Sequence, residues 1–154
     1  MITIRNYSVE DAKALWNIHF YTIRNINIRD YSQAQVEAWA PERLDPSVWE
    51  KRMKGLSPFV AEIDGIIVGY TDLQASGLID HFFCHHEYQG KGVGKALMHH
   101  VFQVGNLRGI KRYFSEVSIT ARPFYEHFGF KVVQAQEIEV RGQKLRNFVM
   151  EKYS

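Results

Sequence analysis

A glycine-rich run between a predicted strand and a predicted helix constrains the fold of this chain more than any other feature. Residues 78–84 are mostly apolar and have the pattern of a strand, whereas residues 92–104 form an amphipathic helical stripe. Three glycines spaced two residues apart, at 90, 92 and 94, lie where the strand gives way to the helix. Residues 111–117 have the pattern of another strand, so we predict a parallel strand, loop, helix, strand crossover with a right-handed connection.

In the remaining sequence, helices predominate in the first third of the chain and strands after it. Helices are expected after Ser8, over Gln33–Trp39, from Asp45 onward and over 122–128. Strands are expected over Ile2–Asn6, Phe59–Ile63, 66–74, 130–140 and 145–151. We therefore predict one α/β (α+β) domain over 1–154, with a mixed, mostly antiparallel central sheet flanked by helices.

Composition and charge restrict the class of partner. Hydrophobic residues make up 45% of the chain and charged residues 23%, which is ordinary for a globular protein. The formal net charge of +2 is too small to favour nucleic acid or an anionic membrane as a partner. The lone cysteine, Cys84, cannot form an internal disulfide, and neither a signal-peptide pattern nor an apolar run of ~20 residues is present. We expect a cytoplasmic protein.

The spacing of the glycines separates several kinds of phosphate-binding loop, all of which direct backbone N–H groups at an anion. A P-loop ending at Gly94-Lys95 would need a glycine at Gln89 and a hydroxyl residue at Ala96. A dinucleotide fingerprint would need a glycine at Lys95 or Leu97. Both interpretations fail on spacing, which argues against a nucleotide-binding regulator.

Two segments in a fixed order resemble one known family. The first is [QR]-x-x-G-x-[GA], present as Gln89-Gly-Lys-Gly92-Val-Gly94. The second, residues 121–130, matches A-x-x-[FL]-Y-E-x-x-G-F. With both, and with the same order of elements over nearly its whole length, the chain resembles the GCN5-related N-acetyltransferases (GNAT). Residues 29–41 further resemble the YafP-like bacterial branch.

The resemblance implies a fold and a reaction. It implies a GNAT-type sheet that splays into a V-shaped cofactor cleft. It also implies transfer of an acetyl group from acetyl-CoA to a primary amine, by direct attack in a ternary complex and without a metal. The acceptor would be a small-molecule or peptide amine, and a homodimer is expected of many relatives. A non-catalytic acyl-CoA-binding sensor on the same fold stays open as the alternative.

The resemblance also implies where coenzyme A binds. Backbone N–H groups of 90–95 would hold the pyrophosphate, with charge from two lysines, and the strand before the loop would pair with the pantetheine arm. Ser118 stands where many relatives carry an asparagine that contacts the cofactor. The expected cofactor-binding residues are Phe82, Phe83, Cys84, Gln89, Gly90, Lys91, Gly92, Val93, Gly94, Lys95 and Ser118. The simpler alternatives are a glycine-rich turn without a ligand and, for Cys84, a small packed apolar residue rather than a nucleophile.

Amine attack on a thioester needs a proton donor for the leaving thiolate and a base for the amine. Tyr125 matches the family's general acid, and the alternative is a core tyrosine. For the base we expect Asp80, because strand alternation puts it on one face with Phe82 and Cys84. Otherwise Asp80 is a structural carboxylate, and His81 or a chain of waters takes its role.

Tyr31 and Trp39 are expected to line the acceptor pocket, unless they are simply core residues. Carboxylates such as Asp30, Glu37 and Asp72 are expected to attract a cationic acceptor. Two groups of adjacent residues, His85-His86-Glu87 and His99-His100, lack metal-ligand spacing, and adjacent side chains point apart on regular elements. We therefore predict no metal site.

Overall fold

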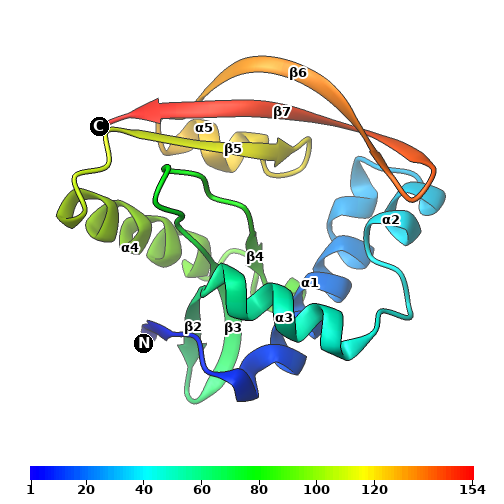
Figure 1. The fold of residues 1–154 in the computed structure, drawn as a ribbon, viewed down its shortest axis with the longest axis horizontal. Helices are drawn as coiled ribbons and strands as arrows, with labels where there is room; N and C mark the ends of the chain where they lie inside the picture. The colour runs from blue at the N-terminus through cyan, green and yellow to red at the C-terminus, as the bar shows by residue number, and fades with distance from the viewer.

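The computed structural model describes residues 1–154 and divides the strands between two sheets (Figure 1). One sheet has the order β1-β2-β3-β4, formed by Ile2–Asn6, Phe59–Ile63, Ile66–Thr71 and Phe82–Cys84. The other has the order β5-β7-β6, formed by Arg112–Ser118, Gln143–Tyr153 and Lys131–Val140. All neighbouring strands within each sheet are antiparallel, which confirms the predicted fold class.

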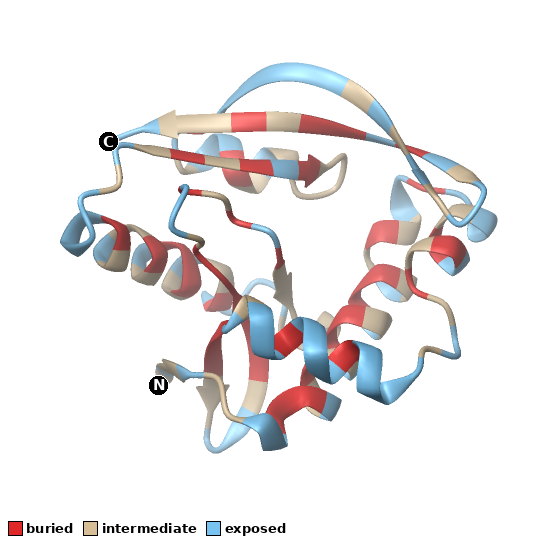
Figure 2. Cartoon of the chain, in the orientation of Figure 1, coloured by how far each residue is buried: buried red, intermediate tan, exposed pale blue.

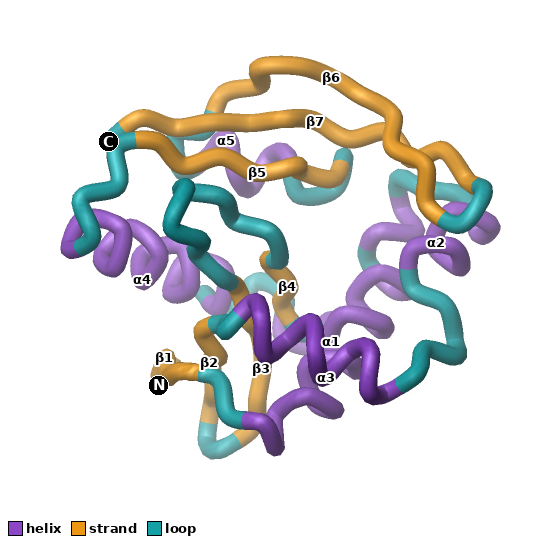
Figure 3. Tube along the Cα trace, viewed as in Figure 1, coloured by secondary structure: helices purple, strands orange, loops and turns teal.

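Helices flank the two sheets, and the outer side of β6 is left uncovered (Figure 3). The α-helices are α1 Ala12–Asn25, α2 Gln33–Trp39, α3 Pro46–Leu56, α4 Val93–Leu107 and α5 Arg122–His127. The 3-10 helices are η1 Val9–Asp11, η2 Asn27–Arg29 and η3 His86–Tyr88. Two α-helices begin where the sequence predicts because their caps are local: Ser32 Oγ accepts the Gln35 N–H (3.1 Å), and Asp45 accepts the Ser47 N–H (2.9 Å). No helix has the length and apolar character needed to span a bilayer.

The two sheets meet at one parallel bridge, between Leu78 and Phe114. There the N–H of Ile79 donates to the carbonyl of Phe114 at 2.9 Å. Beyond this bridge β4 and β5 run apart (Figure 3). The single central sheet expected from the sequence is therefore split, and the expected strand 78–84 consists of one bridge and the short paired strand β4.

A buried carboxylate accounts for this interruption. Asp72 directly follows β3 and accepts the backbone N–H groups of His81 (2.7 Å) and Asp80 (3.0 Å). The Gln74 amide donates to the same carboxylate at 2.6 Å. In a continuous sheet, such N–H groups would be bound by a neighbouring strand. Because a side chain binds them here, β3 ends at Thr71 instead of continuing to 74 as predicted.

Helix α4 joins the two halves of the core (Figure 2). Leu97 belongs to a cluster with residues of the first sheet, and Met98 belongs to a cluster that includes Met150 of the second. The adjacent β2 residues Val60 and Ala61 point to opposite faces, as strand geometry requires. Ala61 packs in the α4 cluster, and Val60 packs with α1 and α3. The first sheet is thus covered on both faces, with α4 shared between the two sheets.

Candidate active site

A cleft of about 1040 Å³ opens where β4 and β5 diverge, with walls from both sheets and from α1, α2, α3 and α5. All of the predicted site residues except Lys91 line this cleft. The ammonium of Lys91 lies over the Tyr88 ring, 5.4 Å from the ring centroid. The predicted residues that line the cleft are Tyr31, Trp39, Asp80, Phe82, Phe83, Cys84, Gln89, Gly90, Gly92, Val93, Gly94, Lys95, Ser118 and Tyr125. Segments that are far apart in the sequence therefore meet in one cleft.

The glycine-rich loop forms the N-terminal end of α4. Gly92 is the N-cap with φ 83°, a left-handed conformation that favours glycine. The N–H of Ala96 donates to the carbonyl of Gly92 at 3.0 Å, so the preceding N–H groups of the first turn have no helical acceptor. Such groups, together with the helix dipole, favour an anion. Lys95 is exposed in the same turn and adds positive charge.

The Gln89 side chain ties this loop to β4. Its Nε2 donates to the carbonyls of Cys84 (3.0 Å) and His85 (3.4 Å). Thr22 of α1 donates to the same Cys84 carbonyl at 2.8 Å. The amide of Gln89 thus binds backbone of its own chain, and the residue positions the loop.

The first turn of α4 lies against α5. A Cβ on Gly94 would be 2.8 Å from Cε1 of Phe124 and 3.6 Å from Sγ of Cys84. The Phe124 ring also contacts Phe82, with centroids 5.1 Å apart. Burial raises the pKa of the Cys84 thiol to about 12, so the thiol stays uncharged. This supports Cys84 as a packing residue and leaves it without the thiolate that a nucleophile needs.

Tyr125 is 3% exposed and lines the cleft. Its ring packs on Phe130 and Phe82, with centroids 4.9 and 6.0 Å away. Burial raises the pKa of Tyr125 above its usual value, an effect that a hydrogen bond with Ser115 partly offsets. The phenol is therefore protonated at neutral pH and can act as a proton donor.

Asp80 and Asp72 have opposite environments although they are close together. Asp80 is exposed and lines the cleft, so its carboxylate is accessible to a ligand. Asp72 is fully buried, and burial raises its pKa to about 6. Hydrogen bonds from Gln74 and His81 favour the carboxylate and partly offset this effect. Sequence reasoning missed the structural role of Asp72. The signal that could have indicated this role is the position of Asp72 in a strand-like run, where aspartate is uncommon.

A buried polar chain lies beside Asp80. The hydroxyl of Tyr70 is 3.0 Å from Nδ1 of His81 and 3.4 Å from Nδ1 of His19, and the two imidazoles stack with centroids 5.5 Å apart. Burial lowers the pKa of both histidines, that of His81 to about 4, so both are neutral at pH 7. His19 was not among the residues predicted for the site. No local signal connects it to His81.

The residues predicted for the acceptor pocket are both present in the cleft. Tyr31 is buried; its hydroxyl donates to the Arg146 carbonyl (2.6 Å) and accepts the Ile119 N–H (2.9 Å). That hydroxyl therefore joins the segment between η2 and α2 to β7 and to the residue after β5, and the ring is what a ligand can contact. Trp39 is half-buried, with its ring 6.4 Å from that of Phe83.

The predicted carboxylates do not gather at the acceptor end. Asp30, Glu37 and Asp72 are all absent from the cleft lining, so the structure does not support them as an attractor for a cationic acceptor. Arg52 and Arg141 line the cleft instead.

Ser118 closes the end of β5. Its Oγ accepts the Ala121 N–H at 3.0 Å and lies 3.4 Å from the Asn27 amide. The hydroxyl therefore shapes the turn that leads into α5, next to the cleft.

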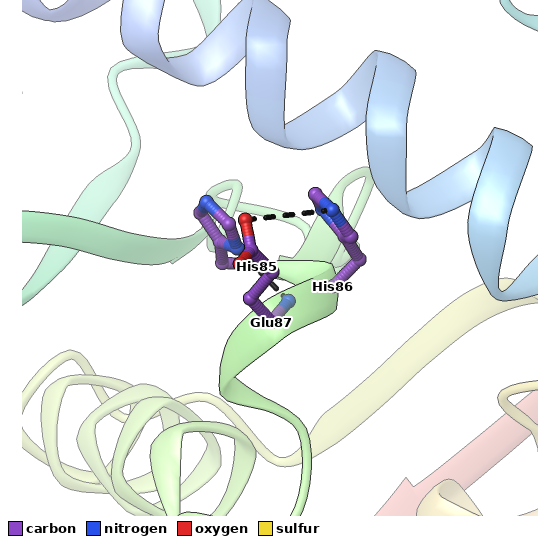
Figure 4. A group of neighbouring side chains, drawn as sticks. All are labelled: His85, His86 and Glu87. Carbon is purple, nitrogen blue, oxygen red and sulfur yellow. Dashed lines mark hydrogen bonds and ion pairs between the residues drawn. The ribbon is translucent and has the colours of Figure 1, made fainter.

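Three neighbouring side chains at the start of the loop bring possible metal ligands together (Figure 4). The ligand atoms of His85, His86 and Glu87 lie within 4.8 Å of one another, and the two imidazoles stack. The argument that adjacent side chains point apart is wrong here, because these residues enter a 3-10 turn. However, Nδ1 of His85 accepts the Glu87 N–H at 3.0 Å, which places the ring proton on Nε2. The arrangement therefore favours a hydrogen-bonded turn, and the absence of a metal stays a prediction.

Comparison with known proteins defines the class. The acetyltransferase (GNAT) domain family matches residues 27–152. The chain is 32% identical over 149 residues to the uncharacterized N-acetyltransferase YafP of Escherichia coli (strain K12), covering 97% of this chain and 94% of that protein. The chain belongs to the GNAT acetyltransferase family. Within that family it falls in the YafP-like branch, as the sequence predicted.

Solved structures share the fold over essentially the whole chain. A GCN5-related N-acetyltransferase from Rhodopseudomonas palustris superposes with a TM-score of 0.94 at 28% identity, covering 99% of this chain and 95% of that one. The PaiA N-acetyltransferase from Thermoplasma acidophilum, solved in complex with coenzyme A, gives 0.76 at 21% identity, covering 100% and 99%.

Proposed function

We propose that the chain is an acetyl-CoA-dependent N-acetyltransferase that acts as one domain, over 1–154, on the primary amine of a small molecule or peptide. The observation that carries this proposal is the position of Tyr125. Its buried, protonated phenol stands in the same cleft as the anion-favouring end of α4. A proton donor beside a phosphate-binding helix end is what thioester aminolysis needs.

Two features of the cleft fit coenzyme A. The first turn of α4, with Lys95, would bind the pyrophosphate. The second feature is the free edge of β4, which pairs with β3 on one side only. Backbone groups of Phe82–Cys84 on that edge can therefore bind the amide groups of the pantetheine arm, as a neighbouring strand would.

Each residue then has a defined role in the transfer. Acetyl-CoA, when bound, supplies a thioester whose carbonyl carbon takes the amine nitrogen. Asp80 accepts a proton from the ammonium form of the acceptor. A backbone N–H of β4 donates to the carbonyl oxygen as negative charge develops there. Tyr125 donates its phenolic proton to the departing thiolate, and the proton lost by the attacking nitrogen restores it.

Binding and turnover should be measured separately. Calorimetry should show acetyl-CoA binding, and a thiol-release assay should show turnover with at least one group of a panel of amines. Binding without thiol release from any group would favour the non-catalytic sensor. A protein that neither binds acetyl-CoA nor releases thiol would contradict the proposal.

A further inference from the structure

We propose that the acceptor amine also carries a carboxylate, and that Arg52 of α3 and Arg141 of the β6–β7 turn bind this carboxylate in the cleft. The inference rests on the proposed function, because it describes the second substrate of the same site. It replaces the cationic acceptor expected from the sequence.

The two arginines reach the cleft from separate elements. Arg52 belongs to α3, and Arg141 lies in the turn between β6 and β7, with φ 45°. In Figure 1, α3 lies along the lower part of the view and this turn lies near the upper right, beside α2. Both side chains line the cleft, and no carboxylate lies within 4.0 Å of either one. Their charges are therefore not neutralised by an ion pair within the chain.

Arg141 is held in place by backbone. Its Nη1 donates to the Ala38 carbonyl of α2 at 2.8 Å. A guanidinium has five N–H donors, so others stay available to a ligand. Planar guanidinium groups bind carboxylates through paired, charge-assisted hydrogen bonds, which makes arginine better suited to this ligand than lysine.

Both positive charges act on the same region of the site. Each contributes to lowering the pKa of the buried His19 imidazole, after burial and His81. Arg52 and Asp80 act in opposite directions on the pKa of His81. Arg52, Arg141 and the accessible carboxylate of Asp80 therefore all act on this pair of histidines, an arrangement complementary to a zwitterion.

Other residues of the cleft lining are apolar. Trp16, Trp39, Pro41, Leu44 and Phe83 line the cleft with the two arginines. In an α-amino acid the ammonium and the carboxylate are on the same carbon, so they would lie together, the ammonium toward Asp80 and the carboxylate toward the arginines. The apolar or aromatic side chain would then pack against these residues. The acceptor class is thus an amino-acid-like primary amine with an apolar side chain.

The test compares pairs of amines that differ only in the carboxylate. Calorimetry at saturating coenzyme A would measure the Kd of L-phenylalanine against 2-phenylethylamine, and of L-leucine against 3-methylbutylamine. We expect the carboxylate-bearing member to bind about 10-fold more tightly, the usual effect of hydrogen bonds to a charged group. R52Q and R141Q should each reduce the ratio, and the double variant should abolish it. R43Q, an exposed arginine outside the cleft lining, should leave the ratio unchanged.

Equal Kd values within each pair, tighter binding of the decarboxylated members, or no binding of either amino acid would overturn the inference. An unchanged ratio in the double variant, with a circular dichroism melt like that of the wild type, would also overturn it. Thiol release from acetyl-CoA separates this inference from the proposed function. Amino acids that bind without turnover contradict the function alone, whereas turnover of amines regardless of the carboxylate contradicts the inference alone.

Discussion

The carboxylate of Asp72 accepts the backbone N–H of His81 at 2.7 Å, at the point where the two sheets separate. The same carboxylate accepts the N–H of Asp80 at 3.0 Å. A side chain therefore fixes the backbone of the proposed base, whereas the neighbouring strands β3 and β4 are held by backbone pairing with each other.

D72N should destabilise the fold by about 1–3 kcal/mol, because the amide offers one acceptor oxygen where the carboxylate offers two, and it brings N–H donors toward backbone N–H groups. The free energy of unfolding from urea titration at pH 7 measures this. D64N is the matched control: Asp64 is exposed in a turn with φ 51°, which asparagine tolerates. Equal losses in the two variants would show that the Asp72 hydrogen bonds contribute nothing.

Y125F should lower turnover roughly 100-fold or more and leave acetyl-CoA affinity within about 2-fold, because it removes the proton donor and keeps the buried ring. Thiol-release kinetics and calorimetry measure the two effects. Y113F is the control, since Tyr113 belongs to the same core cluster and does not line the cleft. Undiminished turnover in Y125F would point to another acid.

The identity of the base can be tested at two neighbouring residues. D80N should lower turnover at least about 10-fold, because it removes the accessible carboxylate without touching the buried polar chain. H81Q should have a smaller effect, since the low pKa of His81 makes it a weak base. Steady-state rates with a saturating amine decide between them. The reverse order of effects would assign the role to His81.

G94A should weaken acetyl-CoA binding, because its Cβ would lie 2.8 Å from Phe124 and push α5 away from the loop. We expect a loss of about 10-fold in affinity, measured by calorimetry. G55A is the control: Gly55 lies in α3 with nothing within 4 Å of an added Cβ, so alanine should raise stability by up to ~1 kcal/mol. Unchanged acetyl-CoA affinity in G94A would mean that α5 can move without disturbing the glycine-rich loop.

Stability should rise with pH between about 4 and 6.5. The pKa of His81 falls from 6.5 in the unfolded chain to about 4 in the folded one, so the unfolded state binds more protons in this window. The contribution is roughly 3 kcal/mol at most, is present above 6.5 and is lost as the pH falls through 4. His19 acts in the same direction, whereas the raised pKa of Asp72 opposes both. Urea titrations across this range should give a shallower slope for H81Q than for H99Q, an exposed histidine, and equal slopes would contradict the assignment.

Local features of the chain could be predicted from the sequence. The caps at Ser32 and Asp45, and the glycine-rich start of α4, depend on residues within a few positions of one another. The position of Tyr125 in the cleft was predicted from the segment that contains it. In each case, the residues that determine the local structure lie within a single short motif.

The separation of the sheets and the acceptor end could not be predicted in the same way. Both depend on contacts between residues distant in sequence, such as His19 with Tyr70, 51 positions apart. Neither Arg52 nor Arg141 stands in a motif, and α3 and the β6–β7 turn meet the same cleft only after folding. Periodicity shows which face of an element is buried and does not show which elements share a cavity.

The bridge between Leu78 and Phe114 forms one side of a closed frame around the cleft. On that side the bridge and α4 join the two sheets. On the other side, hydrogen bonds of Tyr31 to β7 and of Arg141 to α2 join the helices to the second sheet. A donor that pairs with the free edge of β4 would therefore enter an opening whose width is limited from both sides.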